Sequence, residues 1–451
     1  MKTEEIKAGE IVRTLCDKGW QAYIVGGAAR DILNGETPVD YDVVTNATYD
    51  QIRTVFKGRK LKVVGISFRV CLIDGIEVAT YRKDTDYGSK EIEGVEAETI
   101  HEDLARRDLT INAMAFCPHT GEIVDDFGGV DDLKNRIIRF TGNPYARIDE
   151  DPCRIIRACR FRAKTEGRFD PETLRALKEN SCRVIEDVAP ERIRLEILKA
   201  MTYGKPGLFF DALNDIGILD AIFPGMVACI DQDGGKYHGE TVYEHLKIVG
   251  DSLPKNRPLL RLVGYLHDIG KPVEAEHNDG NINFIDHERT GAKMVESIMI
   301  ACKFSLKETA WMTSLVNLHM RSIDSSTKKK TIRKALKAFL DSGITWKDWF
   351  LLKVADRKGN LSKADFTQSE IKSIVMKINE VLRPETGDPA FNIRDLAVNG
   401  GDVIKTLTIK EGPEVGILLN KALDYVLDDP ERNNREVLMA YIIECHRKRV
   451  E

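Results

Sequence analysis

Apolar and polar positions follow two different periods along the chain. Up to about residue 145, short apolar runs typical of strands, such as AYIV at 22–25 and KLKVV at 60–64, are mixed with helical spacing. In FRVCLIDGIEVATYR, at 68–82, two such runs flank Asp74 and Gly75, a pair that favours a two-residue hairpin turn. The pattern predicts a mixed sheet with helices in this part of the chain.

From residue 146 onward, the apolar residues recur every three or four positions, as amphipathic helices require. This spacing is seen in DPCRIIRACRFRA at 151–163, PETLRALKEN at 171–180 and ERIRLEILKAM at 191–201, and no convincing strand follows. Six of the nine histidines lie between His238 and His319, which sets that stretch apart. The predicted organisation is an α/β region at 1–145 and three all-α regions at 146–229, 230–360 and 361–451.

Composition narrows the class of protein. Hydrophobic residues make up 42% of the chain and charged residues 31%, which is typical of a soluble globular protein. No run approaches the ~18 apolar residues of a membrane span, and the start MKTEEIKAGE lacks a signal-peptide pattern, so we expect a cytoplasmic protein without a membrane partner. Nine cysteines without a CxxC pair favour buried thiols. The net charge of −5 leaves any nucleic-acid contact to local basic patches.

The most unusual short stretch is DYD, with carboxylates at Asp40 and Asp42. Residues i and i+2 of a strand share a face, so these carboxylates would project together while Tyr41 and Val43 pack on the other face. Two close anions repel unless a cation lies between them, and all-oxygen ligation suits Mg²⁺. The alternative is a solvated edge or a turn whose Asp side chains cap backbone groups.

The neighbouring residues favour the metal interpretation. Gly26 and Gly27 follow the strand AYIV and let a ligand approach the backbone, and a helix expected from Ala28 offers free N–H groups to an anion. Glu77 lies out of phase with its apolar neighbours on the strand after the hairpin turn, and it can add a third carboxylate. Its alternative is an exposed strand residue.

Five motifs occur in an order that carries a resemblance. They are GGAARD at 26–31, DYD at 40–42, EVATYR at 77–82, RRDLTINAMA at 106–115 and EDPCRIIRACRF at 150–161. Over about residues 15–225 the chain resembles the class II tRNA nucleotidyltransferases, which comprise CCA-adding enzymes and bacterial poly(A) polymerases within the DNA polymerase beta superfamily. The resemblance implies a head domain with two Mg²⁺ on the DxD carboxylates, a neck that selects CTP or ATP, and a helical body and tail that grip tRNA.

Two arginines are candidates for contacts with the triphosphate or the ribose. Two metals can activate a primer 3′-hydroxyl and stabilise the departing pyrophosphate, and guanidinium forks match phosphate oxygens. Arg30 follows the glycine pair, and the family pattern RRD assigns Arg107 to nucleotide binding. The alternatives are structural pairs of Arg30 with Asp31 and of Arg107 with Asp108.

The stretch EDPCRIIRACRF suggests how a base is selected. Asp151 and Arg154, three apart on an expected helix, would form one edge that accepts from an exocyclic amino group and donates to a ring nitrogen. Cytosine and adenine match such an edge, whereas uracil and guanine do not. A helical Asp–Arg salt bridge is the alternative. Arg157 is then a plausible phosphate neighbour and Arg160 a weaker one.

A second set of residues follows the order of the HD phosphohydrolase superfamily. The set is His245, His267, Asp268, His287, His319 and Asp356, in the segments YEHLKIVGD, LHDIGKP, DHERTGA, NLHMRS and VADRKGN. The resemblance implies a divalent metal, Ni, Mn, Mg or Zn, in a helical fold, with phosphatase or cyclic-phosphodiesterase activity. Imidazole and carboxylate together are good ligands for such a metal.

Two further segments have candidate roles, one in binding RNA and one in holding helices together. Between Arg321 and Lys337 the chain has seven basic residues and one acidic residue, which predicts a basic amphipathic helix that tracks tRNA phosphates or forms a solvated face. The motif ERIRLE at 191–196 matches another family motif, and Glu191 and Arg192 are expected to fasten helices.

The sequence leaves three functions open. The first is a CCA-adding tRNA nucleotidyltransferase with a fused phosphohydrolase, and the second is a poly(A) polymerase. The third is an HD phosphohydrolase whose head only binds nucleotides. Family members often have a His-Gly-Thr-like step where this chain has Ser67-Phe68-Arg69, and the loop 82–102 lacks the Arg-and-Pro element common in full CCA-adding enzymes. These two departures also allow a specialist that adds only CC or only A.

Overall fold

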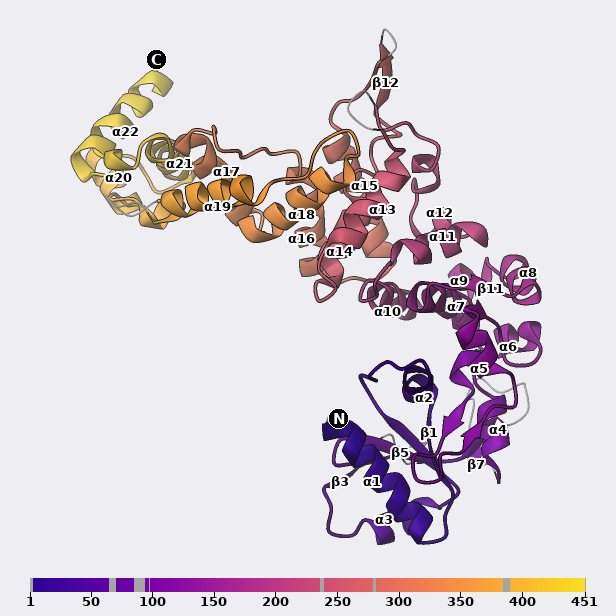
Figure 1. The fold of residues 1–451 in the computed structure, drawn as a ribbon. Helices are drawn as coiled ribbons and strands as arrows, with labels where there is room; N and C mark the ends of the chain where they lie inside the picture. The colour runs from indigo at the N-terminus through magenta and orange to yellow at the C-terminus, as the bar shows by residue number, and fades with distance from the viewer. Residues whose placement is uncertain are drawn as a thin grey trace. The chain divides into compact units, whose positions relative to one another are not determined.

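The computed structural model describes residues 3–64, 70–84, 94–96, 98–235, 239–278, 281–383 and 390–450. The chain divides into two compact units, Met1–Phe223 and Pro224–Glu451. Figure 1 shows the sheet near the N-terminus and the helices that make up most of the remaining chain.

The first unit is built on a seven-stranded mixed sheet with the strand order β3-β4-β5-β2-β1-β8-β9. Its strands are β1 (Ala22–Val25), β2 (Asp42–Thr45), β3 (Leu61–Val64), β4 (Val70–Ile73), β5 (Ile76–Thr80), β8 (Ala115–Phe116) and β9 (Ile123–Val124). Strands β2 and β5 run parallel, and the other neighbours are antiparallel. The mixed sheet predicted for the head is confirmed.

Local chemistry sets the shape of this sheet. Asp74 and Gly75 have φ values of 51° and 96°, the left-handed region that a two-residue hairpin between β4 and β5 requires. Helix α1 (Thr3–Asp17) contacts β1, β2 and β5 and buries Ile11 and Leu15 against them (Figure 1). These apolar contacts therefore stabilise the sheet that carries the DYD segment.

Helices complete the first unit. They are α2 (Gly26–Leu33), α3 (Tyr49–Val55), α4 (Ile100–Ala105), α5 (Gly129–Lys134), α6 (Pro144–Glu150), α7 (Cys153–Thr165), α8 (Pro171–Glu179), α9 (Arg183–Glu186), α10 (Pro190–Ala200), α11 (Gly207–Asp215) and α12 (Leu219–Ile222). Helix α7 packs against α10 and α11. A short parallel pair, β10 (Ile137–Ile138) with β11 (Arg168–Phe169), interrupts the helical run. It is one exception to the expectation that no strand follows residue 146.

Among its described residues, the second unit has helices and one two-stranded hairpin. Its helices are α13 (Val242–Ser252), α14 (Pro258–Leu266), α15 (His287–Ala301), α16 (Leu306–Leu318), α17 (Lys329–Asp341), α18 (Trp346–Gly359), α19 (Gln368–Leu382), α20 (Gly400–Leu407), α21 (Pro413–Asp428) and α22 (Arg435–Val450). The hairpin joins β12 (Ala275–Asn278) to β13 (Asn281–Phe284). The sequence analysis missed it because β12, AEHN, is mostly polar and the alternation in β13, NINF, spans only four residues.

The composition led to expectations about membrane spans and about cysteines. Among the described residues, no helix is long and apolar enough to cross a membrane. All nine cysteines are free thiols and six of them are buried, as predicted.

Candidate functional site

Asp40, Asp42 and Glu77 lie near one another where β2 runs beside β5. Tyr41 and Val43 are buried while Asp40 and Asp42 are exposed, so the predicted alternation is confirmed, although Asp40 lies just before the strand. Glu77 is the direct cross-strand partner of Asp42. Desolvation and the negative charge of Glu77 raise the pKa of Asp42, and Arg107 opposes them. Mutual repulsion of this kind suits a bound cation.

The glycine pair lies at the start of α2, which begins at Gly26 rather than at Ala28 as expected. Gly26 has a φ of 64°, and a Cβ atom there would lie 3.1 Å from a terminal nitrogen of Arg107. Any larger residue would therefore strain the backbone and crowd this arginine. The close approach of the backbone and a guanidinium is what an anionic ligand requires.

The two candidate arginines are held differently from each other. Arg30 donates to Asp31 at 2.9 and 2.8 Å and to Asn112 at 2.5 Å, so its structural alternative is realised. Arg107 does not pair with Asp108. It donates to Asp103 at 3.2 and 2.9 Å instead.

Asp103 is a residue that the sequence analysis missed. Its carboxylate is fully buried, and it grips two guanidinium groups at once, because Oδ1 binds Arg106 and Oδ2 binds Arg107. Burial alone would raise the pKa of Asp103, but the charges of Arg107 and Arg106 lower it overall. The spacing of Asp103 to these arginines, three and four residues, was the available signal.

Replacing Asp103 by Asn should weaken nucleotide binding more than it slows the reaction. The neutral amide can no longer orient both guanidiniums, so we expect KM for the nucleotide to rise about tenfold with a smaller change in kcat. Steady-state kinetics would measure the split. Asp50→Asn, which removes an exposed ion pair to Arg53, is the control. An unchanged KM in the Asp103 variant would contradict this role.

The prediction that Asp151 and Arg154 share a helical face is wrong. Pro152 is the N-cap of α7, so Asp151 precedes the helix, and its Oδ1 accepts from the backbone N–H of Cys153 at 3.1 Å. Arg192 donates to both Asp151 oxygens, at 2.9 and 2.6 Å, which confirms that Arg192 fastens α10 to this segment.

Arg154 is held by other groups. Its guanidinium pairs with Glu150 and donates to the carbonyl oxygens of Arg147, at 2.9 Å, and Arg106, at 3.2 Å. The alternative of a direct Asp151–Arg154 salt bridge is therefore not realised. Both side chains nevertheless face the same cavity.

Arg157 and Arg160 also have partners within the first unit. Arg157 donates to Asp108 at 2.9 and 2.7 Å, and Arg160, which is buried, pairs with Glu196 and with the Tyr203 hydroxyl. The contact of Arg157 with a phosphate stays a prediction.

One cavity of about 660 Å³ collects the predicted residues of the head. Its walls include Gly26, Gly27, Arg30, Asp40, Asp42, Arg107, Asp151, Arg154, Arg157 and Arg160, which is every predicted residue except Glu77. Arg106, Lys164 and Lys199 add further positive charge. The cavity thus places a cationic wall beside the carboxylates, as binding of a metal-bound triphosphate requires.

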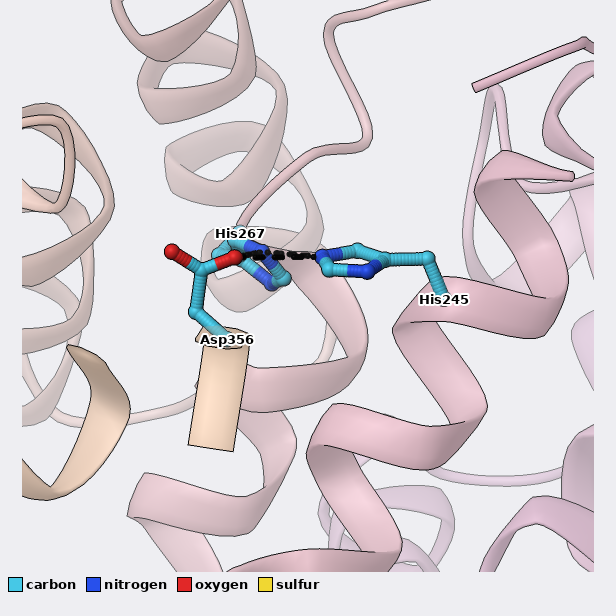
Figure 2. Close-up of side chains that lie close together, drawn as sticks. All are labelled: His245, His267 and Asp356. Atoms are coloured by element: carbon cyan, nitrogen blue, oxygen red, sulfur yellow. Dashed lines mark hydrogen bonds and ion pairs between the residues drawn. The ribbon is translucent and has the colours of Figure 1, made fainter. Parts of the chain in front are cut away.

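The six residues of the HD pattern converge in the second unit. His245 lies on α13, His267 and Asp268 directly follow α14, His287 begins α15, His319 directly follows α16 and Asp356 lies on α18. His245 Nε2 is 3.2 Å from His267 Nε2 and 3.3 Å from Asp356 Oδ1 (Figure 2). In the part of the chain that the structure describes, only this cluster brings three ligand atoms within 4.8 Å of one another.

Asp268 lies between two groups of histidines. Its Oδ1 is 3.2 Å from Nε2 of His287 and 3.2 Å from Nε2 of His319. Its Oδ2 is 3.4 Å from Nε2 of His267 and 3.5 Å from Nε2 of His245. The Asp268 carboxylate can therefore bind a metal ion together with either pair of histidines.

Backbone hydrogen bonds fix the orientation of three imidazoles. Nδ1 of His267, His287 and His319 lies 2.9, 2.7 and 2.6 Å from the carbonyl oxygens of Gly264, Phe284 and Val316. Since a carbonyl only accepts, each Nδ1 carries a proton and each Nε2 faces the cluster, where a neutral ring offers its lone pair to a metal. These residues fit a divalent metal.

The electrostatics of the metal-free cluster differ from one histidine to the next. Burial lowers the pKa of His267 to about 3, so its ring is neutral. Burial opposes the charged form of His245 too, but hydrogen bonds to Asp356 and Glu240 raise its pKa to about 9. Neighbouring imidazoles and Lys271 hold the pKa of Asp268 well below its usual range despite burial. A buried carboxylate that stays ionised beside imidazole rings suits a cation.

Other residues around this cluster were not predicted. Lys271 Nζ is 2.7 Å from Asp268, Lys353 Nζ is 3.0 Å from Asp356, and Glu240 lies 3.5 Å from Nδ1 of His245. Each lysine is three residues from its aspartate, so the sequence contained a helical-spacing signal for both. Glu240 had no such signal.

The basic helix expected after Arg321 is α17. Its apolar face is buried, but Lys334 and Lys337 pair with Asp428 and Asp341 at 2.8 and 2.7 Å. Neighbouring acids thus partly balance its charge, and contact with tRNA stays a prediction.

Three protein families match consecutive parts of the chain. Residues 22–139 match the poly A polymerase head domain, residues 168–230 match the probable RNA and SrmB-binding site of polymerase A, and residues 236–342 match the HD domain.

Relatives of two kinds align with the chain. It is 31% identical to poly(A) polymerase I of Haemophilus influenzae over 292 residues, 60% of this chain and 64% of the relative. It is 25% identical to the CCA-adding enzyme of Ligilactobacillus salivarius over 448 residues, 96% of this chain and 95% of the relative. The chain spans about half to two thirds of the length of the poly(A) polymerase relatives.

Solved structures share the fold. The CCA-adding enzyme of Bacillus stearothermophilus, in complex with CTP, gives a TM-score of 0.70 at 23% identity over 100% of this chain and 99% of that chain. The Thermotoga maritima CCA-adding enzyme, in complex with tRNA, gives 0.57 at 19% identity over 99% of this chain and 96% of that chain. The chain therefore combines matches to the poly A polymerase head domain, to the probable RNA-binding site of polymerase A and to the HD domain with the fold of CCA-adding enzymes.

Proposed function

We propose that the protein adds CCA to tRNA 3′ ends from CTP and ATP without a nucleic-acid template. The observation that carries this proposal is the single cavity in which the DYD carboxylates face eight predicted nucleotide-binding residues. The CTP-bound and tRNA-bound relatives support the substrate classes.

The residues of the head have separate tasks in this proposal. Asp40, Asp42 and Glu77 would hold Mg²⁺, which supplies activation of the primer 3′-hydroxyl and stabilisation of pyrophosphate when it is bound. Arg106 and Arg107 orient the triphosphate, and Arg30, which Asp31 and Asn112 hold, lines the same cavity.

Asp151 and Arg154 read the base from the cavity wall. A carboxylate anchored by Arg192 still has lone pairs that can accept from the amino group of C or A, and Arg154 donates to the ring nitrogen. Arg157 and Arg160 stabilise this wall through Asp108 and Glu196.

Asp151→Ala should relax base selection. The Asp151 carboxylate accepts from the amino group of C or A but repels the carbonyl oxygen of U or G. Without this acceptor the enzyme no longer rejects UTP and GTP, so discrimination between CTP and UTP should fall about 100-fold. Single-nucleotide incorporation with each triphosphate would measure the ratio of kcat/KM values. Asp149→Ala, which removes an exposed neighbour outside the cavity, is the matched control. Full discrimination in the Asp151 variant would exclude the protein-template account.

Two related activities remain alternatives. A poly(A) polymerase would extend an RNA with ATP alone, and a specialist would stop after CC or start only from CC. The segment Ser67-Phe68-Arg69 and residues 85–93 and 97 of the loop 82–102, on which this choice depends, lie outside the described residues. Extension of a tRNA that lacks CCA, with CTP and ATP together or separately, tests the proposal. Addition limited to three nucleotides supports it, and a long A tail contradicts it.

We also propose a phosphohydrolase site in the HD domain. His245, His267, Asp268 and Asp356 would hold a divalent metal, and His287 and His319 complete the other side of Asp268. The metal supplies a water of lowered pKa when it is bound. The substrate class is a 3′-phosphate or a 2′,3′-cyclic phosphate on a tRNA end, since such ends lack the hydroxyl that the head requires. The division into head, neck, HD domain and tail at 145, 229 and 360 stays part of this proposal.

A further inference from the structure

The HD cavity extends well beyond its metal-ligating residues. It has a volume of about 320 Å³, and its lining includes Lys353, Asp356 and Arg357 of α18 and Asn360, which directly follows that helix. These positions follow the i, i+3, i+4, i+7 spacing of a single helical face. The cations of Lys353 and Arg357 therefore lie about one helical turn apart, about 6 Å along the helix axis, with the metal-ligating Asp356 between them in the sequence.

The lining residues carry an excess of positive charge. Among the described residues that line the cavity, Lys271, Lys353, Arg357 and Lys363 are cationic, and Asp268 and Asp356 carry carboxylates. A bound divalent metal would increase this excess. A singly charged cyclic phosphodiester cannot balance it, whereas a phosphate monoester with a second phosphate group can.

The cations form two separate pairs. Lys271 and Lys353 each contact a metal-ligating aspartate, at 2.7 and 3.0 Å, and so lie at the metal end of the cavity. Arg357 is placed by the loop after α18, since its Nε donates to the Ala364 carbonyl at 2.8 Å and its guanidinium lies 4.9 Å from the Phe366 ring centre. Lys363 belongs to the same loop.

The walls also contain apolar surface. Phe366 lies beside Arg357, and Phe284 lies 5.5 Å from Lys271 Nζ. Aromatic rings next to cations are suited to nucleotides, because bases stack on the rings while phosphates bind the charges.

From this arrangement, and resting on the proposed phosphohydrolase activity, we propose that the HD cavity binds an RNA end through two successive phosphates. Lys271 and Lys353 face the terminal 3′-phosphate monoester, and Arg357 and Lys363 face the phosphodiester that precedes it. The site therefore prefers a phosphorylated oligonucleotide end over a mononucleotide.

The reaction at this site is a hydrolysis. The oxygen of water forms a bond to phosphorus while the bond from phosphorus to the ribose 3′-oxygen breaks. That 3′-oxygen receives a proton, and the products are inorganic phosphate and a free 3′-hydroxyl. No oxidant or further reactant is needed.

The test compares three substrates of the full-length protein with added Ni²⁺, Mn²⁺ or Mg²⁺. They are cytidine 3′-monophosphate, the cytidine dinucleotide with a 3′-phosphate, and the same dinucleotide with an uncharged methylphosphonate linkage. We expect kcat/KM for the charged dinucleotide to exceed that for each of the others about tenfold. Arg357→Gln and Lys363→Gln should bring this ratio close to one. Lys358→Gln, on the same helix but outside the cavity lining, should leave the ratio unchanged.

A second readout does not need hydrolysis. Isothermal titration calorimetry of metal-free protein should show weaker binding of the charged dinucleotide 3′-phosphate in Arg357→Gln than in Lys358→Gln. Equal turnover of all three substrates, or equal binding by these variants, would overturn the two-phosphate site. Absence of phosphate release from every substrate would refute the phosphohydrolase itself, and the binding measurement would still decide the inference.

Discussion

Asp42→Ala is expected to reduce nucleotide addition to tRNA below about 1% of the wild-type rate, a loss of at least about 2.7 kcal/mol of transition-state stabilisation. Asp42 lies between Asp40 and its cross-strand partner Glu77, so its removal takes the central carboxylate from the proposed Mg²⁺ ligands. Single-turnover incorporation of labelled CTP would measure the effect, and Asp40→Ala should behave in the same way.

Two controls distinguish this loss from unfolding. Asp42 is exposed on the sheet surface, so circular dichroism should show an unchanged fold. Phosphate release by the HD domain should continue, because its ligands lie in the other unit. Retention of more than a few per cent of addition would refute the assignment of Asp42.

The double variant His267→Ala with Asp268→Ala is expected to lose phosphate release and bound transition metal while keeping tRNA extension. His267 belongs to both sets of candidate ligands, His245 with His267 and Asp356, and His267 with Asp268 and His319, and Asp268 belongs to the second set. A lost ligand lowers metal affinity by at least about 10–100-fold. A phosphate-release assay and elemental analysis would provide the two measurements.

His277→Ala is the matched control for this variant. His277 lies on β12 in the same domain but outside the cluster, so its removal should change neither measurement. Since the cluster is buried, circular dichroism must show that the double variant is folded. Loss of both activities from a folded double variant would indicate one shared site and contradict the two-site account.

Local patterns predicted the head well because its signals lie within single elements. The alternation around Asp42 and the turn at Asp74 and Gly75 depend on neighbours in the chain, and both are confirmed. The helical spacing assumed for Asp151 failed because Pro152 begins a new helix directly after it.

Partners distant in sequence could not be predicted. Arg157 binds Asp108 across 49 residues, and Arg107 binds Asp103 instead. Nothing in local spacing chooses between these two carboxylates, since the choice depends on how α7 packs. In the HD domain the order of histidines predicted the cluster, but the buried Glu240 beside His245 was visible only in the folded chain.

The most direct measurement gives the purified protein three tRNAs, ending before CCA, after C and after CC, with each of the four nucleotides supplied separately. The account predicts CMP addition to the first two and AMP addition to the third, with UTP and GTP rejected throughout. Addition of AMP in long runs to all three ends, or no addition to any of them, would contradict it.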